Sequence, residues 1–555
     1  MKKVFILIMF FVNSSNLLSQ NRIDSSYIKT IYNRAEKILK NIDIKDSVKY
    51  KNLKDIIASQ YFKLNEIHNA HNNAINEMKE KYKDNNELKD SLIENIKTKT
   101  LLNQFKLHNS FLANLYTELS FSDVEKIKDE MTYNVMNKTY NVYLLMIPGL
   151  SEDQKKFIKK NLWEARELAM DAGTAEEKHG IFGKYKGKIN NYLSNCGYNM
   201  KLIEKEFIKK TKTGQMLSAE IMEKIYNKIK TPYKYGLVLV PDSGKMFDCP
   251  TIFRYGKKWF MSFIVFDGKG YETWLAESKN LIDWKIKGRI LSFSEDNSWD
   301  SYQKAGYVAL RNINWNENYE LKKHDGKFWM SYFGGQSKGY EKGLLSIGMA
   351  FTTKNPSKIH EWNRFDKPIL SPKDTNVRWW ENSTMYKNFV FYDEAKVTGY
   401  PFVMFYNARG DSLKPNRGAE RIGMAVSNDM IHWYRFNKEP VINHHIGICG
   451  DPEIHKIDSV YVMFYFGAFW PGRKEAFNRF ACSTDLINWT EWHGDDLVKP
   501  SEDFDNQFAH KSSVVVQDGI VYHFYCAVDK YNNRGIALST SVDLGKSKLN
   551  FMLKK

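Results

Sequence analysis

The chain has 555 residues, of which 43% are hydrophobic and 14% aromatic, and its formal net charge is +17. This length exceeds one ordinary hydrophobic core, so a single small domain is excluded and two or more domains are expected. Lysines that coat helices account for the positive charge without any partner, and an acidic glycan is the alternative reading.

The first twenty residues have the three regions of a secretory signal peptide. Residues 1–3 are basic at two positions, residues 4–12 are apolar, and a small, polar stretch ends at residue 20. No later apolar run is long enough to span a bilayer, and no cysteine lies near the cleavage region to carry a lipid. We therefore expect a periplasmic or secreted protein, for which nucleic acid is a poor partner.

The cysteines do not form a disulfide framework or a zinc site in this interpretation. Their number is odd and no pair has CxxC spacing, which favours buried free thiols in a chain of this size. They are Cys196, Cys249, Cys449, Cys482 and Cys526.

Residues 21–212 have a helical period and form the predicted helical domain. Apolar side chains recur at helical spacing, as at Ile28, Ile31, Ala35 and Leu39. Capping-box patterns mark three helix starts: Ser122-x-x-Glu125, Ser151-x-x-Gln154 and Thr174-x-x-Glu177. We expect a bundle of about six helices, with a coiled-coil-like hairpin over residues 52–97 and a linker helix over residues 213–233.

The predicted helical domain carries several short motifs. They include Met146-Ile147-Pro148, Glu164-Ala165-Arg166-Glu167, Ala169-Met170-Asp171-Ala172-Gly173 and residues 182–192. On these motifs, residues 118–198 resemble domain of unknown function 3826, a small helical domain of exported proteins of Bacteroidetes. The resemblance brings no known chemistry, but it supports a domain boundary.

From about Tyr233 the period changes to two, and one motif repeats. The motif is Ala-x-Ser, a short turn and a tryptophan; it ends at Trp284, Trp433 and Trp489, a longer copy ends at Trp362, and a degenerate copy covers residues 537–543. An aromatic strand precedes each copy. The five repeats predict an all-β, five-bladed propeller over residues 234–555, in which the repeated tryptophans pack the blades.

The starts of the innermost strands are expected to face one axial mouth. The candidates there are Asp248, Glu320, Glu381, Asp451 with Glu453, and the pair His510 and Lys511. A carboxyl that stays protonated can donate to a leaving oxygen, while an ionised one activates water or attacks the anomeric carbon. The set therefore predicts cleavage of a glycosidic bond.

With these residues in place, residues 234–547 resemble the five-bladed glycoside hydrolases, the superfamily of families 43, 32, 62, 117 and 130. The family 43 pattern implies a general base at Asp248, a supporting acid at Glu320 and a general acid at Glu381, for which Asp451 is the alternative. It also implies that His510 helps to hold a central water or a structural calcium ion. An inverting mechanism and no required cofactor follow from the same likeness.

Aromatic and cationic side chains are expected to contact the sugar around the mouth. The predicted substrate-binding residues are Trp299, Trp379, Trp380, Arg421, Trp470, His510 and Lys511, and Phe469 is expected beside them as a further ring suited to stacking on a sugar. The predicted function is an exported glycoside hydrolase that removes a terminal sugar from a poly- or oligosaccharide. Two alternatives stay open: a phosphorylase of the same fold, in which phosphate replaces water, and a glycan-binding propeller without catalysis.

Overall fold

The computed structural model describes residues 25–213, 216–242, 244–410 and 418–551, so the predicted signal peptide lies outside the described residues. The chain divides into two compact units: residues 1–140 with 158–189, and residues 141–157 with 190–555. This division does not coincide with the predicted boundary at residue 212. Among the described residues, no helix is both long enough and apolar enough to cross a membrane.

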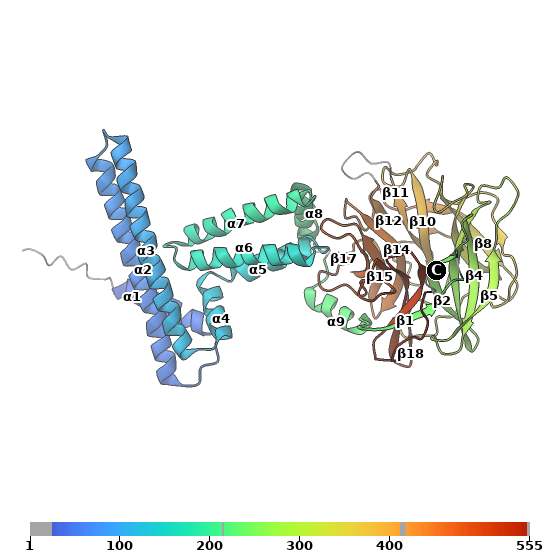
Figure 1. The fold of residues 1–555 in the computed structure, drawn as a ribbon, viewed down its shortest axis with the longest axis horizontal. Helices are drawn as coiled ribbons and strands as arrows, with labels where there is room; N and C mark the ends of the chain where they lie inside the picture. The colour runs from blue at the N-terminus through green and yellow to red at the C-terminus, as the bar shows by residue number, and fades with distance from the viewer. Residues whose placement is uncertain (1–24, 214–215, 243, 411–417, 552–555) are drawn as a thin grey trace, which may run out of the picture. The chain divides into compact units, whose positions relative to one another are not determined.

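The helices occupy residues 25–229, and the described part of the chain contains nine of them rather than the predicted six or so. They are α1 (Ser25–Leu39), α2 (Ser47–Lys81), α3 (Asn86–Glu118), α4 (Phe121–Met131), α5 (Val135–Met146), α6 (Glu152–Met170), α7 (Ala175–Asn195), α8 (Met200–Lys212) and α9 (Ala219–Ile229). The long helices α2 and α3 lie side by side as the predicted hairpin (Figure 1). Leu53 and Ile57 of α2 pack with Phe111 and Leu115 of α3 in the core of the first unit.

Two of the three predicted capping boxes are confirmed. The Ser151 hydroxyl accepts from the amide of Gln154, whose side chain accepts in return from the Ser151 amide, and Thr174 and Glu177 pair in the same way. The third prediction is wrong, because α4 begins two residues earlier than a cap at Ser122 requires and Ser120 is its N-cap. Reciprocal caps of this kind fix a helix start from local sequence alone.

The strands pair in successive antiparallel groups along the chain (Figure 1). The first two groups are β2 (Met246–Tyr255), β3 (Lys258–Phe266), β4 (Tyr271–Ser278) and β5 (Trp284–Leu291), then β6 (Gln303–Val308), β7 (Phe328–Gly335), β8 (Ser346–Thr352) and β9 (Asn363–Arg364). The next two are β10 (Thr384–Tyr392), β11 (Phe402–Arg409), β12 (Glu420–Ser427) and β13 (Trp433–Arg435), then β14 (Ile448–Ile457), β15 (Val460–Ala468), β16 (Ala476–Ser483) and β17 (Thr490–Glu491). The last is β18 (Phe508–Gln517), β19 (Ile520–Val528) and β20 (Arg534–Thr540), completed by β1 (Tyr233–Leu239).

Neighbouring groups touch at one end of their strands. The third strand of a group pairs in parallel with the inner strand of the next through single residue pairs, as in Tyr271 with Gln303, Glu420 with Ile448 and Ala476 with Phe508. The first strand of the β part, β1, pairs antiparallel with the last, β20. This arrangement is typical of a propeller, and the count of five blades stays a prediction.

The repeated tryptophans serve packing, as predicted. In three copies the indole nitrogen donates to a backbone carbonyl within its own turn: Trp284 to Leu281, Trp433 to Met430 and Trp489 to Leu486, at 2.9–3.1 Å. The serine of each copy accepts a backbone amide of the same turn. Each repeat therefore closes a strand group locally, and its tryptophan fills the core beside it.

Candidate active site

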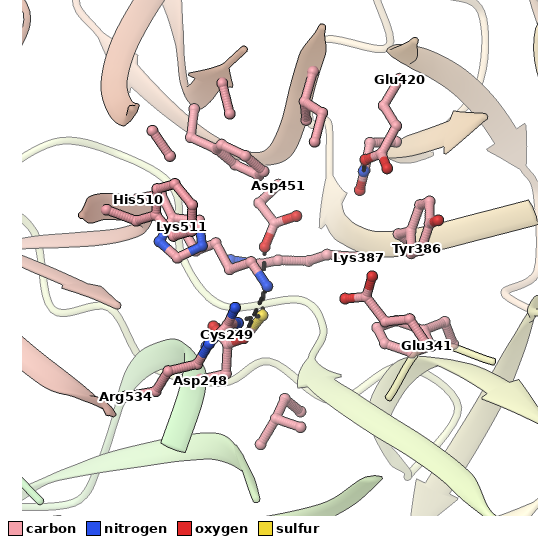
Figure 2. A pocket seen from close by; sticks show the side chains of 18 of the residues that line it. Asp248, Cys249, Glu341, Tyr386, Lys387, Glu420, Asp451, His510, Lys511 and Arg534 are labelled. Carbon is pink, nitrogen blue, oxygen red and sulfur yellow. Dashed lines mark hydrogen bonds and ion pairs between the residues drawn. The ribbon is translucent and has the colours of Figure 1, made fainter. Parts of the chain in front are cut away.

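A cavity of about 200 Å³ opens in the β part, with carboxylates, cations and aromatic rings in its wall. Figure 2 shows side chains from several strand groups directed into it. The charged residues that line it are Asp248, Glu341, Lys387, Glu420, Asp451, Lys511 and Arg534, and His510 is beside them. The cavity thus offers both hydrogen-bond donors and acceptors to a ligand rich in hydroxyl groups.

The inner strands of four groups share one irregularity at this cavity. In β2, β10, β14 and β18 an extra residue shifts the pairing register. A bulge of this kind leaves residues unpaired and redirects their side chains. In each bulge the first residue without a partner on the neighbouring strand lines the cavity. These residues are Cys249, Tyr386, Asp451 and Lys511.

Asp248 forms the most tightly bound carboxylate of the site. It accepts from the Lys511 ammonium at 2.9 Å, from the Arg534 guanidinium at 3.2 Å and from the Cys249 amide at 2.8 Å. Burial opposes ionisation, but the charges of Lys511 and Arg534 outweigh it and hold the pKa of Asp248 well below its ordinary value. Asp248 is therefore ionised, and protein donors already occupy both of its oxygens.

Glu341 and Glu420 direct their carboxyl groups into the same cavity (Figure 2). Glu420 is the first residue of β12 and accepts from the side-chain amide of Asn407 at 2.9 Å. Glu341 lies between β7 and β8 and accepts from the Tyr271 hydroxyl at 3.5 Å. Burial and the charge of Glu341 raise the pKa of Glu420 to about 8, so Glu420 holds a proton at neutral pH.

Asp451 lines the same cavity. Its carboxylate accepts a weak hydrogen bond from the Cys249 thiol at 3.4 Å, and burial raises its pKa against the opposing charges of Lys511 and Lys387. Lys387 is also buried, and its ammonium donates to the Ser512 carbonyl at 3.4 Å. Asp451 and Lys387 can therefore bind sugar hydroxyl groups as an acceptor and donor pair.

The surroundings of His510 do not fit the calcium ion considered above. Calcium takes six to eight oxygen ligands, whereas the charged neighbours of His510 are Lys511, Arg534 and an Asp248 carboxylate that both cations already occupy. Within the described ranges, no group of three or more His, Cys, Asp or Glu side chains is arranged to hold a metal. Burial and the charge of Lys511 lower the pKa of His510 to about 3, so this imidazole is neutral.

Two carboxylates that the sequence placed at the mouth lie elsewhere. Glu320 is exposed in the connection between β6 and β7, because the inner strand of this group is Gln303–Val308 and not the segment around Glu320. Glu381 is fully buried before β10 and outside the cavity wall. It accepts from Arg435 at 2.6 Å and from the Tyr406 hydroxyl at 2.5 Å, which makes it part of a structural ion pair.

The predicted sugar-binding residues are mostly absent from the cavity wall as well. His510 and Lys511 line it, but Trp299, Trp379, Trp380, Arg421 and Trp470 do not. Trp380 and Trp470 are buried core residues, Trp299 stacks on Tyr332, and the buried Arg421 guanidinium lies over the ring of Trp379. The size of an aromatic side chain and its closeness in sequence to a strand start therefore do not show whether it packs in the core or binds a sugar.

The sequence interpretation missed Glu341, Lys387, Glu420 and Arg534. It considered only the starts of inner strands, whereas Glu341 and Glu420 lie where the second strand of a group turns into the third. The parallel pair of Glu420 with Ile448 brings that turn beside the next inner strand. A search for acids at these turns would have included both residues.

Solved structures resemble more than half of this chain. A glycoside hydrolase structure is 48% identical to this chain, covers 60% of it and 99% of its own chain, and superposes with a TM-score of 0.59. The chain belongs to the propeller glycoside hydrolase-like superfamily. A second solved structure, a complex of BT0996 with RGII, is 49% identical and covers 60% of this protein and 98% of its own length, with a TM-score of 0.59.

This superfamily member also matches curated phosphorylases over a shorter range. A 1,2-beta-oligomannan phosphorylase from Thermoanaerobacter sp. (strain X514) is 32% identical over 143 residues, which are 25% of this chain and 46% of the relative. The chain spans about half the length of the curated relatives that it matches. These likenesses support a glycan-active enzyme.

The helical part has its own family match. Residues 28–213 match the family described as "Protein of unknown function (DUF3826)". This confirms the resemblance found from the motifs, but the match is wider than the predicted range of 118–198 and begins within α1.

Proposed function

We propose that this protein is a glycoside hydrolase that removes a terminal sugar from a poly- or oligosaccharide. The observation that carries the proposal is the pair of carboxyl groups, Glu420 protonated and Glu341 beside it, in one cavity. Two interacting carboxyls that titrate apart supply the acid and the anion that glycoside cleavage requires. The likeness to a glycoside hydrolase structure over 60% of the chain supports the same assignment.

In this proposal Glu420 donates a proton to the glycosidic oxygen as the bond to the anomeric carbon breaks. Burial raises the pKa of Glu341 as well, against the charge of Lys511, and in this proposal Glu341 is the partner that reacts as the anion. It activates water or attacks the anomeric carbon directly. This replaces the assignments of the acid to Glu381 or Asp451 and of the base to Asp248, because Glu381 is outside the cavity and Asp248 is held by two cations. Inversion of configuration stays a prediction.

Asp248 and Asp451 then have supporting roles and do not act on the anomeric carbon. Asp248 holds Lys511 and Arg534 in the wall, while Asp451 and Lys387 face the ring of the bound sugar. We further propose that the strand groups form five blades around this cavity, which would bring all these residues to one axial mouth.

Phosphorolysis is the second candidate, because the curated relatives are named as phosphorylases. A phosphate dianion needs cations that are free to bind it. Two of the three lysine and arginine residues among the described lining residues, Lys511 and Arg534, are already paired with Asp248, and four carboxylates share the wall. This charge balance favours water over phosphate as the second substrate.

The test is release of sugar by the purified protein from plant, algal and host polysaccharides and from aryl glycosides, with and without phosphate. Hydrolysis predicts a free reducing sugar in phosphate-free buffer, and a loss of at least about 100-fold in Glu420→Gln and in Glu341→Gln. Turnover that requires phosphate, with a sugar phosphate as product, would establish the phosphorylase instead. Glycan binding with no turnover, unaffected by either substitution, would identify a binding propeller.

A further inference from the structure

One of the apolar clusters that line the cavity lies beside an exposed aromatic ring. The cluster is made by Ile448, Phe466, Ala468, Ala476 and Phe508, and Phe469 also lines the cavity. Phe466 is only 5% exposed, whereas Phe469 is 50% exposed. Phe469 therefore lies at the opening, where part of a ligand longer than the cavity would pass.

The backbone holds Phe469 in this exposed position at some conformational cost. Its φ is +56°, a value that bulky residues rarely adopt. The next residue, Trp470, is buried, donates from its indole to the Ile448 carbonyl at 2.8 Å and stacks on His444 at 3.7 Å. Because Trp470 is fixed on the core side, the chain reversal turns the ring of Phe469 outward, and Phe508 supports it edge to face at 5.8 Å.

Gly447 links the backbone of Phe469 to that of the proposed acid, Glu420. A Cβ at Gly447 would lie 2.8 Å from the carbonyl carbon of Phe469, so only glycine permits this close approach. The Gly447 carbonyl in turn accepts the backbone amide of Glu420 at 3.0 Å. Phe469 and Glu420 are thus held in a fixed register through one glycine.

We propose that Phe469 is the stacking platform for the sugar on the leaving-group side of the scissile bond. This rests on the proposed function: a terminal sugar fills the cavity, Glu420 protonates its glycosidic oxygen, and the sugar that carries this oxygen emerges over Phe469. An exposed aromatic ring recognises the apolar C–H face of a pyranose or furanose. The ligand class is accordingly a chain of at least two sugars, and not a glycoside with a small alcohol.

The test compares two substrates of the same terminal sugar in wild type and Phe469→Ala. One is the oligosaccharide from which the wild type releases that sugar, and the other is the corresponding glycosyl fluoride, whose leaving group is too small to stack. We expect kcat/KM to fall about tenfold on the oligosaccharide and to stay within about twofold on the fluoride. Phe469→Tyr should retain the wild-type values, and Tyr434→Ala, which removes an exposed ring on β13, is the matched control.

Equal losses on both substrates, or no loss on the oligosaccharide, would overturn the inference and leave the hydrolase assignment intact. If the wild type turns over no glycan, the proposed function fails. The role of Phe469 in stacking on a sugar is then tested by measuring glycan binding. Affinity gels that contain pectin, arabinan, xylan or β-mannan should then retard the wild type more than Phe469→Ala. Equal mobility of the two proteins in every gel would also overturn it.

Discussion

The charge of Glu341, added to burial, holds the pKa of Glu420 at about 8. The two residues come from different strand groups, and only the fold brings their carboxyl groups into one cavity. Because like charges in a shared site resist simultaneous ionisation, one of the two keeps its proton at neutral pH. The proposed mechanism depends on this relationship.

The activity should fall on the alkaline side with a midpoint near pH 8. The protonated form of Glu420 is the active acid, so the active fraction declines as the pH rises through its pKa of about 8. A pH profile of kcat/KM on a natural oligosaccharide measures this limb. In Glu420→Gln, assayed with the glycosyl fluoride, the limb should be absent; a limb that persists there would assign the titration to another group.

Asp248→Asn should destabilise the fold as well as the site. Loss of this charge leaves Lys511 and Arg534 buried without their carboxylate, which costs about 3–5 kcal/mol. Chemical denaturation measures the free energy of unfolding, and Asp518→Asn, at an exposed turn, is the matched control.

The stability lost in Asp248→Asn should become smaller as the pH falls. The folded pKa of Asp248 is lowered, so its stabilisation is fully present above the unfolded pKa of about 4 and is lost as the pH falls below that value. The difference between wild type and Asp248→Asn should therefore narrow in acid. A difference that stays constant below pH 4 would show that the ion pairs are not its source.

Glu381 separates a structural carboxylate from a catalytic one. Glu381→Ala removes a partner of the buried Arg435, which keeps Asp374, and we expect a loss of about 3 kcal/mol in unfolding free energy. The folded fraction should retain the wild-type kcat, because the carboxyl group is outside the cavity. A variant that folds normally and loses 100-fold in kcat would restore Glu381 as the acid.

The thiols should be inert in the folded protein. Four of the five cysteines are buried, and burial with the charge of Asp248 raises the pKa of Cys249 further. Reaction with a thiol reagent should label at most one group, Cys196, in native protein and five after denaturation. Rapid labelling of Cys249, the cysteine among the described lining residues, in native protein would mean that the cavity opens.

The β part was largely predictable from sequence because its period and its Ala-x-Ser…Trp repeat are local signals. Asp248, Asp451, His510 and Lys511 followed from counting to the start of each inner strand, where a repeated bulge turns side chains inward. The proposed acid, Glu420, was not found in this way. Glu420 and Glu341 lie at turns between strands, where acids are common, and only tertiary contact distinguishes these two.

Packing in the core also determines which aromatic side chains are exposed and can stack on a sugar. Trp380, Phe469 and Trp470 were all expected to stack on a sugar, but both tryptophans fill the core, whereas Phe469 is exposed. The second strand group shows a related limit: its true inner strand, Gln303–Val308, has no acid at its start, so the sequence pattern pointed to Glu320 instead.

The most direct test of the acid assignment is the leaving-group dependence of Glu420→Gln in phosphate-free buffer. We predict that kcat/KM falls at least about 100-fold on the natural oligosaccharide, whose leaving oxygen needs a proton. On the 2,4-dinitrophenyl glycoside of the same sugar, whose leaving group needs none, the loss should stay below about tenfold, while exposed Glu320→Gln matches wild type on both. Equal losses of Glu420→Gln on the two substrates, or wild-type turnover only with phosphate, would contradict the account.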